Sequence, residues 1–132
     1  MKTTALCATI FAVLAANVHA EDIVVIVNSA AKPVSKEQIV DVYLGRSAEL
    51  TPIDQTVGSP IYVEFYKKTT GRDAAQIKAI WSRILFTGRG QPPKQLPDSA
   101  AVKKSVAANP NAVGYIEKSA VDATVKVALP LD

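Results

Sequence analysis

The sequence predicts an α/β fold in which helices flank a small mixed sheet. The β-branched run at residues 23–27 is typical of a strand buried on both faces. Helix start signals, such as the capping pair Ser35 and Gln38, alternate along the chain with further short apolar runs. Strands separated by helices are typical of a layer in which helices cover the faces of a sheet.

The first strand and the helix after it carry the clearest local signals. The strand stops at the turn residues Asn28 and Ser29. Ser35 begins a helix because Gln38, three residues later, completes a capping box, and Gly45 ends it in the left-handed conformation that glycine tolerates. The residues expected to be buried on this helix are Ile39, Val42 and Tyr43.

A second strand and a second helix follow. Residues 50–55 are expected to form a short strand, bounded by turn residues. Ser59 suits a helix cap and Pro60 the first helical position, where a missing N–H removes no helical hydrogen bond. Gly71 closes this helix, and its inward-facing residues are expected to be Tyr62, Phe65 and Tyr66.

A third helix is predicted between Asp73, its cap, and Gly88, because apolar residues follow the spacing of one helix face. The prolines within residues 91–97 remove hydrogen-bond donors and fix φ, so this segment is expected to be an extended connector and not a helix or a central strand. The apolar face of the third helix consists of Ile77, Ile80, Trp81, Ile84 and Leu85.

The last third of the chain predicts one more helix and two strands. The helix covers residues 99–108 and is broken by the Asn-Pro-Asn sequence at 109–111. Residues 113–116 and 125–127 are apolar runs that we expect to complete the sheet as short strands.

The first 20 residues are predicted to be a secretion signal. They have a basic start, an apolar run over residues 5–16 and a small-residue cleavage site that ends at Ala20. The apolar run is shorter than the roughly 20 residues that span a bilayer, which favours cleavage over a membrane anchor. We therefore expect a periplasmic domain at residues 21–132, with no stable membrane insertion after the signal is removed.

The exported chain is expected to contain neither cysteine nor histidine, because Cys7 and His19 both lie in the signal. Imidazole and thiolate are the usual base, nucleophile and zinc ligands of hydrolytic sites. We therefore expect no enzyme, no catalytic residues, no metal site and no cofactor. The dispersed charges, with a net +3 for the whole chain, also argue against a nucleic-acid partner.

Acidic residues offer the remaining route to catalysis, through a pair of carboxylates. No spacing in the sequence brings two of them together, so each is expected to be a solvated surface charge. The four residues considered are Glu49, Asp54, Glu64 and Asp98.

Ligands of open α/β sheets bind at the carboxyl ends of strands, next to helix N-termini. In this sequence those places are Asn28 with Ser29, after the first strand, and residues 55–59, after the second.

Several stretches resemble the periplasmic phosphate-binding proteins that serve ABC transporters. Residues 23–28 and 34–45 resemble the strand that enters the second lobe and its first helix, and residues 51–65 resemble the next strand, ligand loop and helix. Residues 109–116 resemble the late Gly-Tyr turn of that family. Residues 81–93 are the most specific part, and they resemble a group of short, exported relatives with one lobe. The resemblance implies one lobe of a type II periplasmic binding protein.

The resemblance also implies a place for a small oxyanion, phosphate among them. The ligand loop of the family reads Arg-x-x-Gly-Ser-Gly-Thr, and residues 55–61 match it only at Gly58 and Ser59. Gln55 replaces the arginine, which can hold an oxyanion through two charged hydrogen bonds. Pro60 removes an N–H as well. Gln55, Gly58 and Ser59 are therefore candidate ligands for weak binding only.

Each candidate ligand has a structural alternative. Ser59 is also a suitable plain helix cap, and Arg89 lies in a Gly-Arg-Gly sequence that is common in exposed loops. Tyr115 could reach a ligand through its hydroxyl or pack beside the centre of the sheet. Trp81 lies on an apolar stripe and is expected to belong to the core.

Two functions remain open. The first is a solute-binding domain for phosphate or another small oxyanion, with the permease of an ABC transporter as a further partner. The second is a non-transport interaction module, which uses the exposed surface of a single lobe to dock a protein or a second copy of itself.

Overall fold

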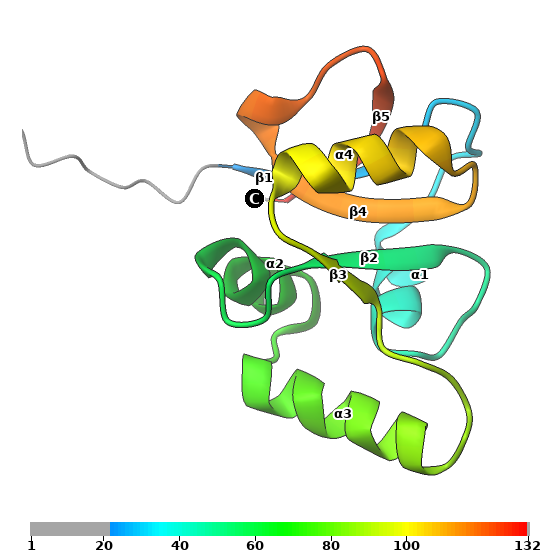
Figure 1. Ribbon diagram of the computed structural model, residues 1–132, viewed down its shortest axis with the longest axis vertical. Helices are drawn as coiled ribbons and strands as arrows, with labels where there is room; N and C mark the ends of the chain where they lie inside the picture. Colours follow the sequence, from blue (N-terminus) through cyan, green and yellow to red (C-terminus); the bar gives the residue numbers. More distant parts are fainter. Residues whose placement is uncertain (1–21, 132) are drawn as a thin grey trace, which may run out of the picture.

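The sheet has five strands in the order β3-β2-β4-β1-β5, and helices cover both of its faces (Figure 1). This computed structural model describes residues 22–131, so the predicted signal at residues 1–20 lies outside the described residues. The mixed sheet with flanking helices confirms the predicted fold class. In chain order the elements are β1 (Ile23–Asn28), α1 (Lys36–Tyr43), β2 (Thr51–Gln55), α2 (Pro60–Thr70), α3 (Ala74–Phe86), β3 (Lys94–Leu96), α4 (Ser99–Ala108), β4 (Ala112–Glu117), the short 3-10 helix Lys118–Ala120 and β5 (Val125–Leu131).

Strand β1 runs opposite to the other four described strands. It is antiparallel to both β4 and β5, whereas β2 is parallel to both β3 and β4. The carboxyl ends of β2, β3 and β4 therefore lie along one edge of the sheet, which we call the carboxyl edge. The carboxyl end of β1 lies at the opposite edge.

The two faces of the sheet have separate apolar cores. Val25 and Tyr115 face the core that packs against α1, α2 and α3, and their neighbours Val24 and Ile116 face α4. Helix α4 approaches β4 closely at Gly114, where an added Cβ would lie 2.5 Å from a methyl carbon of Val102. Glycine is therefore required at this contact.

The helix ends confirm most of the predicted signals. Ser35 and Gln38 form both hydrogen bonds of a capping box at the start of α1. Asp73 caps α3 through a second capping box with Gln76. Pro60 is the first residue of α2, and Gly71 ends that helix with a φ of 69°.

Helix α3 is less buried than its apolar stripe predicts. Ile77 and Trp81 are buried, but Ile80 and Ile84 are half-buried and Leu85 is 51% exposed. Figure 1 shows the reason, since α3 lies at one end of the molecule, beyond α1 and α2, and does not cover the centre of the sheet. Leu85 therefore belongs to the apolar stripe of α3 but not to the core.

The segment after α3 contains a short strand, which was not predicted because the prolines around it argue against a strand. Lys94–Leu96 forms β3 and pairs with β2 in parallel, with Gln55 opposite Leu96. The segment is extended as predicted, but it joins the sheet at an edge, where prolines outside the paired residues do no harm. The last strand is also longer than predicted, because it continues through Pro130 at the other edge.

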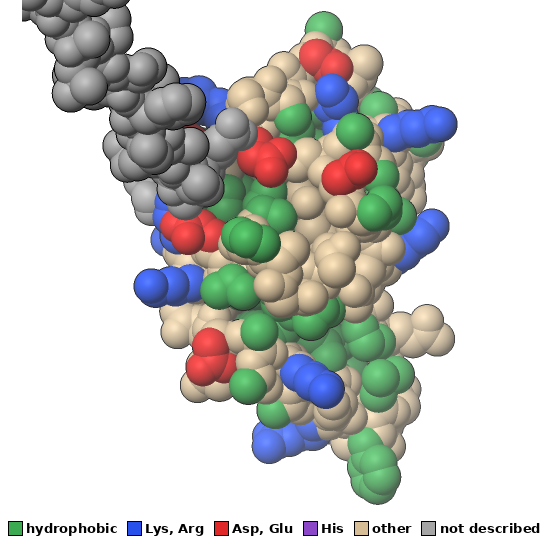
Figure 2. Space-filling model, turned by 60° about the vertical axis from the view of Figure 1, so that its left-hand side comes forward, with side chains coloured by type: hydrophobic (Ala, Val, Ile, Leu, Met, Phe, Trp, Pro, Cys, Tyr) green, Lys and Arg blue, Asp and Glu red, His purple; other side chains and the backbone are tan. Residues whose placement is uncertain are grey.

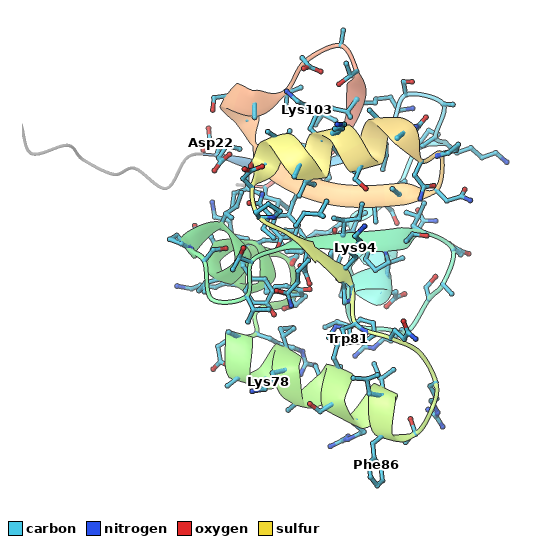
Figure 3. All side chains as sticks on the ribbon, in the orientation of Figure 1. Asp22, Lys78, Trp81, Phe86, Lys94 and Lys103 are labelled. Atoms are coloured by element: carbon cyan, nitrogen blue, oxygen red, sulfur yellow. The ribbon has the colours of Figure 1, made fainter. Side chains whose placement is uncertain are left out.

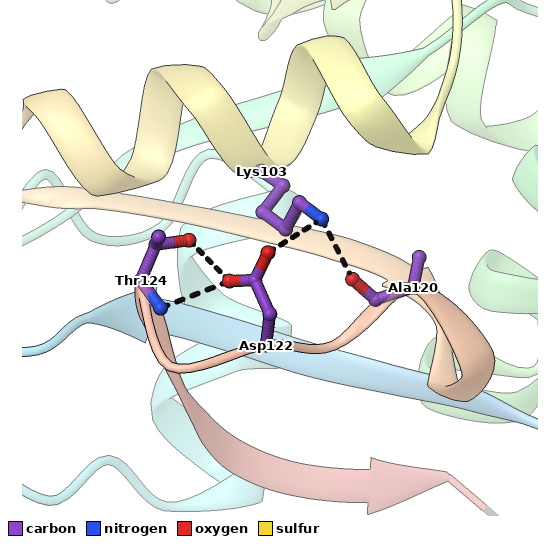
Figure 4. Close-up of polar contacts among 4 residues, drawn as sticks. All are labelled: Lys103, Ala120, Asp122 and Thr124. Atoms are coloured by element: carbon purple, nitrogen blue, oxygen red, sulfur yellow. Dashed lines mark hydrogen bonds and ion pairs between the residues drawn. The ribbon is translucent and has the colours of Figure 1, made fainter.

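A small polar cluster ties α4 to the loop before β5 (Figure 4). The Nζ of Lys103 lies 2.9 Å from a carboxylate oxygen of Asp122 and donates a 3.0 Å hydrogen bond to the Ala120 carbonyl. The backbone N–H of Thr124 donates to the same carboxylate at 2.9 Å. These contacts hold the end of the chain against the α4 face of the sheet.

Candidate functional site

The carboxyl edge brings Gln55 and Tyr115 together. The backbone N–H of Gln55 donates to the Tyr115 hydroxyl at 3.1 Å, and its side-chain amide donates to the Tyr115 carbonyl and to the Ser99 hydroxyl, both at 3.0 Å. Gln55 is only 4% exposed and Tyr115 is fully buried. Both side chains are therefore engaged with the protein, and they support the loop that follows β2.

That loop leads into α2 through a tight turn. The N–H of Ser59 donates to the Thr56 carbonyl at 3.0 Å, and Gly58 has a φ of 82°, as the third residue of a type II turn requires. A Cβ added to Gly58 would meet nothing within 4 Å, so the turn faces open space. We call Gly58, Ser59 and the first turn of the helix the α2 entrance.

The Ser59 hydroxyl has no hydrogen-bond partner among the described residues. Ser59 occupies the cap position of α2, but its side chain makes no capping bond, and its Oγ is buried. The first intrahelical bond runs from Val63 to Ser59, so the N–H groups of Ile61 and Tyr62 lack an intrahelical acceptor. Ser59 therefore does not cap α2 through its side chain, contrary to the structural alternative. The α2 entrance keeps the N–H groups of Ile61 and Tyr62 and the Ser59 hydroxyl as donors without an acceptor among the described residues.

Asn28 and Ser29 do not join this site. Val27 pairs with Val113 and Thr51 pairs with Ala112, so the end of β1 lies where β2 and β4 begin. The Asn28 amide donates to the carbonyls of Val106 and Ala107 at the end of α4, and Ser29 is exposed. Both places lie at carboxyl ends of strands, as expected, but they lie at opposite edges of the sheet because β1 is antiparallel to β4.

Arg89 lies in a third region. It is exposed in the connection between α3 and β3, and it lines a groove of about 390 Å³ together with Arg46, Gly45 and Thr51. Thr51 is the first residue of β2, whereas Ser59 follows the end of that strand. Arg89 is therefore not close to the α2 entrance, and its role as a ligand stays a prediction.

Asp54 is a functional candidate that the sequence analysis missed. It was expected to be a solvated surface charge, but it is 4% exposed. Its two carboxylate oxygens accept hydrogen bonds from the hydroxyls of Tyr66 and Tyr115, each at 2.8 Å. Its position inside the predicted strand 50–55, next to the carboxyl edge, was the signal that could have found it.

Burial changes the acidity of this cluster. Desolvation raises the pKa of Asp54 to about 7, although the hydrogen bonds from Tyr66 and Tyr115 lower it. Desolvation and the nearby Asp54 charge together raise the pKa values of Tyr66 and Tyr115 well above the ordinary tyrosine range. Among residues 22–131, no Lys or Arg forms an ion pair with Asp54. The carboxylate is therefore held by neutral donors alone.

Asp54 lines a groove between α3 and the rest of the molecule, which we call the α3 groove. Its volume is about 250 Å³, and it also contacts Val57 beside the α2 entrance. Figure 3 shows Trp81 pointing from α3 toward the sheet and Phe86 pointing away from the end of the helix. The other lining residues are Tyr62, Ile77, Lys78, Trp81, Ser82, Leu85, Pro92, Pro93 and Gln95.

Two features are absent from residues 22–131. No group of three or more His, Cys, Asp and Glu side chains is placed to hold a metal ion in this part of the chain. Nor does any helix there have the length and apolar character needed to cross a membrane.

Comparison with known proteins gives matches in structure only. No protein-family model matches the sequence, and no curated protein matches it. An ABC-type phosphate transport receptor from Vibrio cholerae matches 81% of the chain with a TM-score of 0.62 and 18% identity, and the match covers 45% of the receptor. A putative phosphate ABC transporter substrate-binding protein from Clostridium perfringens, solved with bound phosphate, matches 81% of the chain with a TM-score of 0.63 and 21% identity, over 44% of its own length.

These matches establish the fold. The chain has the architecture of part of these two transport proteins, as its resemblance to phosphate-binding proteins implied, and it spans less than half the length of either. Both are described as components of phosphate transport.

Proposed function

We propose that the protein is an exported, single-lobe binding domain that holds phosphate or another small oxyanion weakly at the α2 entrance. The observation that carries this proposal is the buried Ser59 hydroxyl without a partner, at a helix N-terminus next to the open Gly58 turn. The fold supports it, because one structural neighbour, the protein from Clostridium perfringens, is solved with bound phosphate.

The chemistry of the α2 entrance suits an anion. The N-terminus of a helix carries a partial positive charge of roughly half a unit, and its free N–H groups point toward a ligand. Ile61 and Tyr62 supply two such groups, and the Ser59 hydroxyl, which has no partner among the described residues, supplies a third donor. Gln55 and Tyr115 do not contact the anion in this proposal, but their hydrogen bonds to each other hold the start of the loop in place.

The same geometry limits the affinity. Gln55 carries no charge and its amide is already bonded within the protein, while Pro60 has no N–H. One charge-assisted hydrogen bond contributes about 1.5 to 3 kcal/mol, so the missing arginine lowers affinity by roughly tenfold to a hundredfold. We expect a dissociation constant in the millimolar range.

Isothermal titration of the purified protein with phosphate and with sulfate tests this proposal. We expect weak, saturable binding that Ser59→Ala reduces and that Ser29→Ala, at the opposite edge of the sheet, leaves unchanged. A double variant with Pro60→Gly and Ile61→Thr adds an N–H and a hydroxyl to the α2 entrance, so it should bind phosphate more tightly. No heat at millimolar phosphate from protein with a native circular dichroism spectrum would refute solute binding.

Export is part of the same proposal, and residues 1–20 support it by their basic start, apolar run and small-residue cleavage site. The mature protein is then periplasmic, where the permease of an ABC transporter is the partner that would receive the anion. N-terminal sequencing of the protein from a periplasmic fraction should begin at Glu21. A different first residue, or recovery only from the cytoplasm, would contradict it.

A second candidate function is an interaction module, and one observation favours it. Phe86 is 94% exposed and lies next to the half-exposed Leu85 at the end of α3. Figure 2 shows apolar side chains gathered at this end of the molecule. Exposed apolar patches of this kind mark interfaces between proteins.

Light scattering separates the two functions. If the end of α3 mediates self-association, Phe86→Ser should convert an oligomer to a monomer, and Val63→Ser, which removes an exposed apolar side chain from α2, should not. A protein that is monomeric at all concentrations, with no partner recovered with it, would remove this candidate.

A further inference from the structure

We infer that the α3 groove is a binding site for a small organic amine, with an ammonium group directed at Asp54 and an apolar body along the walls. This site adjoins the α2 entrance, with which it shares Tyr62, and has the opposite charge preference. Three observations carry the inference: a buried carboxylate without a cation, aromatic walls around it, and a volume that suits a small organic molecule.

The carboxylate is the feature that calls for a cation. Asp54 lines the groove although it is 4% exposed, and it is bonded only to the neutral hydroxyls of Tyr66 and Tyr115. Removing a carboxylate from water without an opposite charge costs several kcal/mol. An ammonium group in the groove would supply the missing charge and a charge-assisted hydrogen bond.

The walls of the groove suit the rest of such a ligand. Tyr62 and Trp81 are aromatic, and aromatic faces attract ammonium groups as well as apolar surface. The indole N–H of Trp81 already donates to the Tyr43 carbonyl at 3.1 Å, so it is not available to an anion. Leu85 and Pro93 extend the apolar surface, and a volume of about 250 Å³ accepts a molecule with one ring.

Lys78 is the one cation among the residues that line the groove. It is exposed on α3, and Figure 3 shows it on the same helix as Trp81. It forms no ion pair with Asp54, and a lysine ammonium on a flexible stem can turn to solvent when a ligand enters. Lys78 therefore does not supply the charge that Asp54 lacks.

The inference also predicts the pH dependence of binding. The groups that interact with Asp54 are Tyr43 of α1, Tyr62 and Tyr66 of α2 and Tyr115 of β4, with Lys78 of α3 lining the same groove. Burial raises the pKa of Asp54 to about 7, and it raises the pKa values of the four tyrosines further above their ordinary range. Because an ammonium ligand selects the ionised carboxylate, its affinity should rise between pH about 5.5 and about 8.

Fluorescence provides the test, because Trp81 is the single tryptophan of the sequence and lines the groove. Phenethylamine is the probe, and phenethyl alcohol and hydrocinnamate are matched neutral and anionic compounds with the same apolar body. We expect saturable quenching by phenethylamine and at least tenfold weaker binding of the other two. Equal binding of the alcohol, or tighter binding of hydrocinnamate, would overturn the inference.

Variants locate the charge preference within the groove. Asp54→Asn should weaken phenethylamine binding roughly tenfold to a hundredfold, the range for one charge-assisted hydrogen bond, whereas Glu37→Gln on the exposed face of α1 should leave it unchanged. Leu85 is half-exposed and tolerates substitution, so Leu85→Lys should weaken binding and Leu85→Glu should strengthen it even if Asp54→Asn fails to fold. Full affinity in Asp54→Asn, or equal affinity in the two Leu85 variants, would contradict the site.

The outcome is independent of oxyanion binding. Ser59→Ala should reduce the response to phosphate and not to phenethylamine, and Asp54→Asn should do the reverse. If one of the two ligands does not bind, the proposal for the other ligand is therefore unaffected.

Discussion

Asp54 shows how a single buried charge can be set by residues that are distant in the sequence. Its hydroxyl partners are Tyr66 on α2 and Tyr115 on β4, and Tyr43 of α1 lies in the same cluster. The residues next to Asp54 in the sequence do not predict these contacts, because the hydrogen bonds depend on how β2, α2 and β4 pack together. The tyrosine hydroxyls give each carboxylate oxygen a hydrogen bond, but no described Lys or Arg forms an ion pair with Asp54.

We predict that Asp54 makes the protein less stable as pH rises from about 4 to about 7. The folded-state pKa of about 7 is raised above the ordinary value, so the folded protein keeps a proton that the unfolded chain has already lost. The favourable contribution is complete below pH about 4 and is lost as pH approaches the folded pKa, a change of about 4 kcal/mol at 1.36 kcal/mol per unit. Urea unfolding across this pH range measures it.

Asp54→Asn is the control for this pH dependence, since an amide does not titrate. The slope of unfolding free energy against pH should disappear in this variant. Asp122, whose pKa is lowered to about 2 by hydrogen bonds from Thr124 and Lys103, changes charge below the pH range of the experiment. An unchanged slope in Asp54→Asn would assign the effect to another group.

At the scale of elements, the helix caps distinguish a structural serine from a candidate ligand. Ser35 accepts a hydrogen bond from the Gln38 N–H at 3.2 Å, as a cap does. Ser59 occupies the equivalent position of α2 and makes no such bond. The same residue type therefore stabilises one helix and is left unpaired at the start of another.

This difference predicts opposite results for one substitution. Ser35→Ala should destabilise the protein by about 1 kcal/mol, the usual cost of losing a cap. Ser59→Ala should change stability by less than about 0.5 kcal/mol, because it removes a buried hydroxyl that has no partner. Thermal unfolding of the two variants checks both values. A larger loss in Ser59→Ala than in Ser35→Ala would show that Ser59 caps its helix in solution.

The elements that the sequence predicted correctly are those with local signals. The capping box at Ser35, the proline at position 60 and the glycine at position 71 each act within a few residues, and each fixes a helix end. The strand β3 was missed because its three residues gain a partner only when β2 lies beside them. The exposure of Leu85 was missed because helix periodicity gives the apolar face of α3 but not how much surface is available to cover it.

The candidate site was predicted less well than the fold. Gly58 and Ser59 were placed at a helix entrance from their own neighbourhood, and they are there. Their separation from Asn28 depends on the direction of β1 relative to β4, a property of the whole sheet. The burial of Asp54 depends on the same long-range packing.

For the whole molecule, the shared sheet should couple the two cores. Val106 lies in the core under α4, whereas Trp81 belongs to the core on the other face. Val106→Ala removes buried methyl groups from one side, at a cost of about 1 to 3 kcal/mol. We predict that the urea transition seen by Trp81 fluorescence shifts as far as the transition seen by circular dichroism.

Separate midpoints for the two signals would show that the cores unfold independently. Gly90→Ala is a suitable control, because its added Cβ meets a single side-chain carbon of Ile84 at 3.5 Å, an ordinary contact distance. It should leave both midpoints unchanged. Coincident transitions in both proteins are the expected signature of one cooperative unit.

Pairing of β1 with β5 sets Ile23 directly opposite Leu131. A host protein could therefore receive residues 22–131 as a cassette, grafted into a single surface loop with short linkers, because the entry and exit points are neighbours. Joining the same two points by a brief peptide would equally allow new termini to be opened at the exposed tip after α3, giving a circular permutant with its sheet intact.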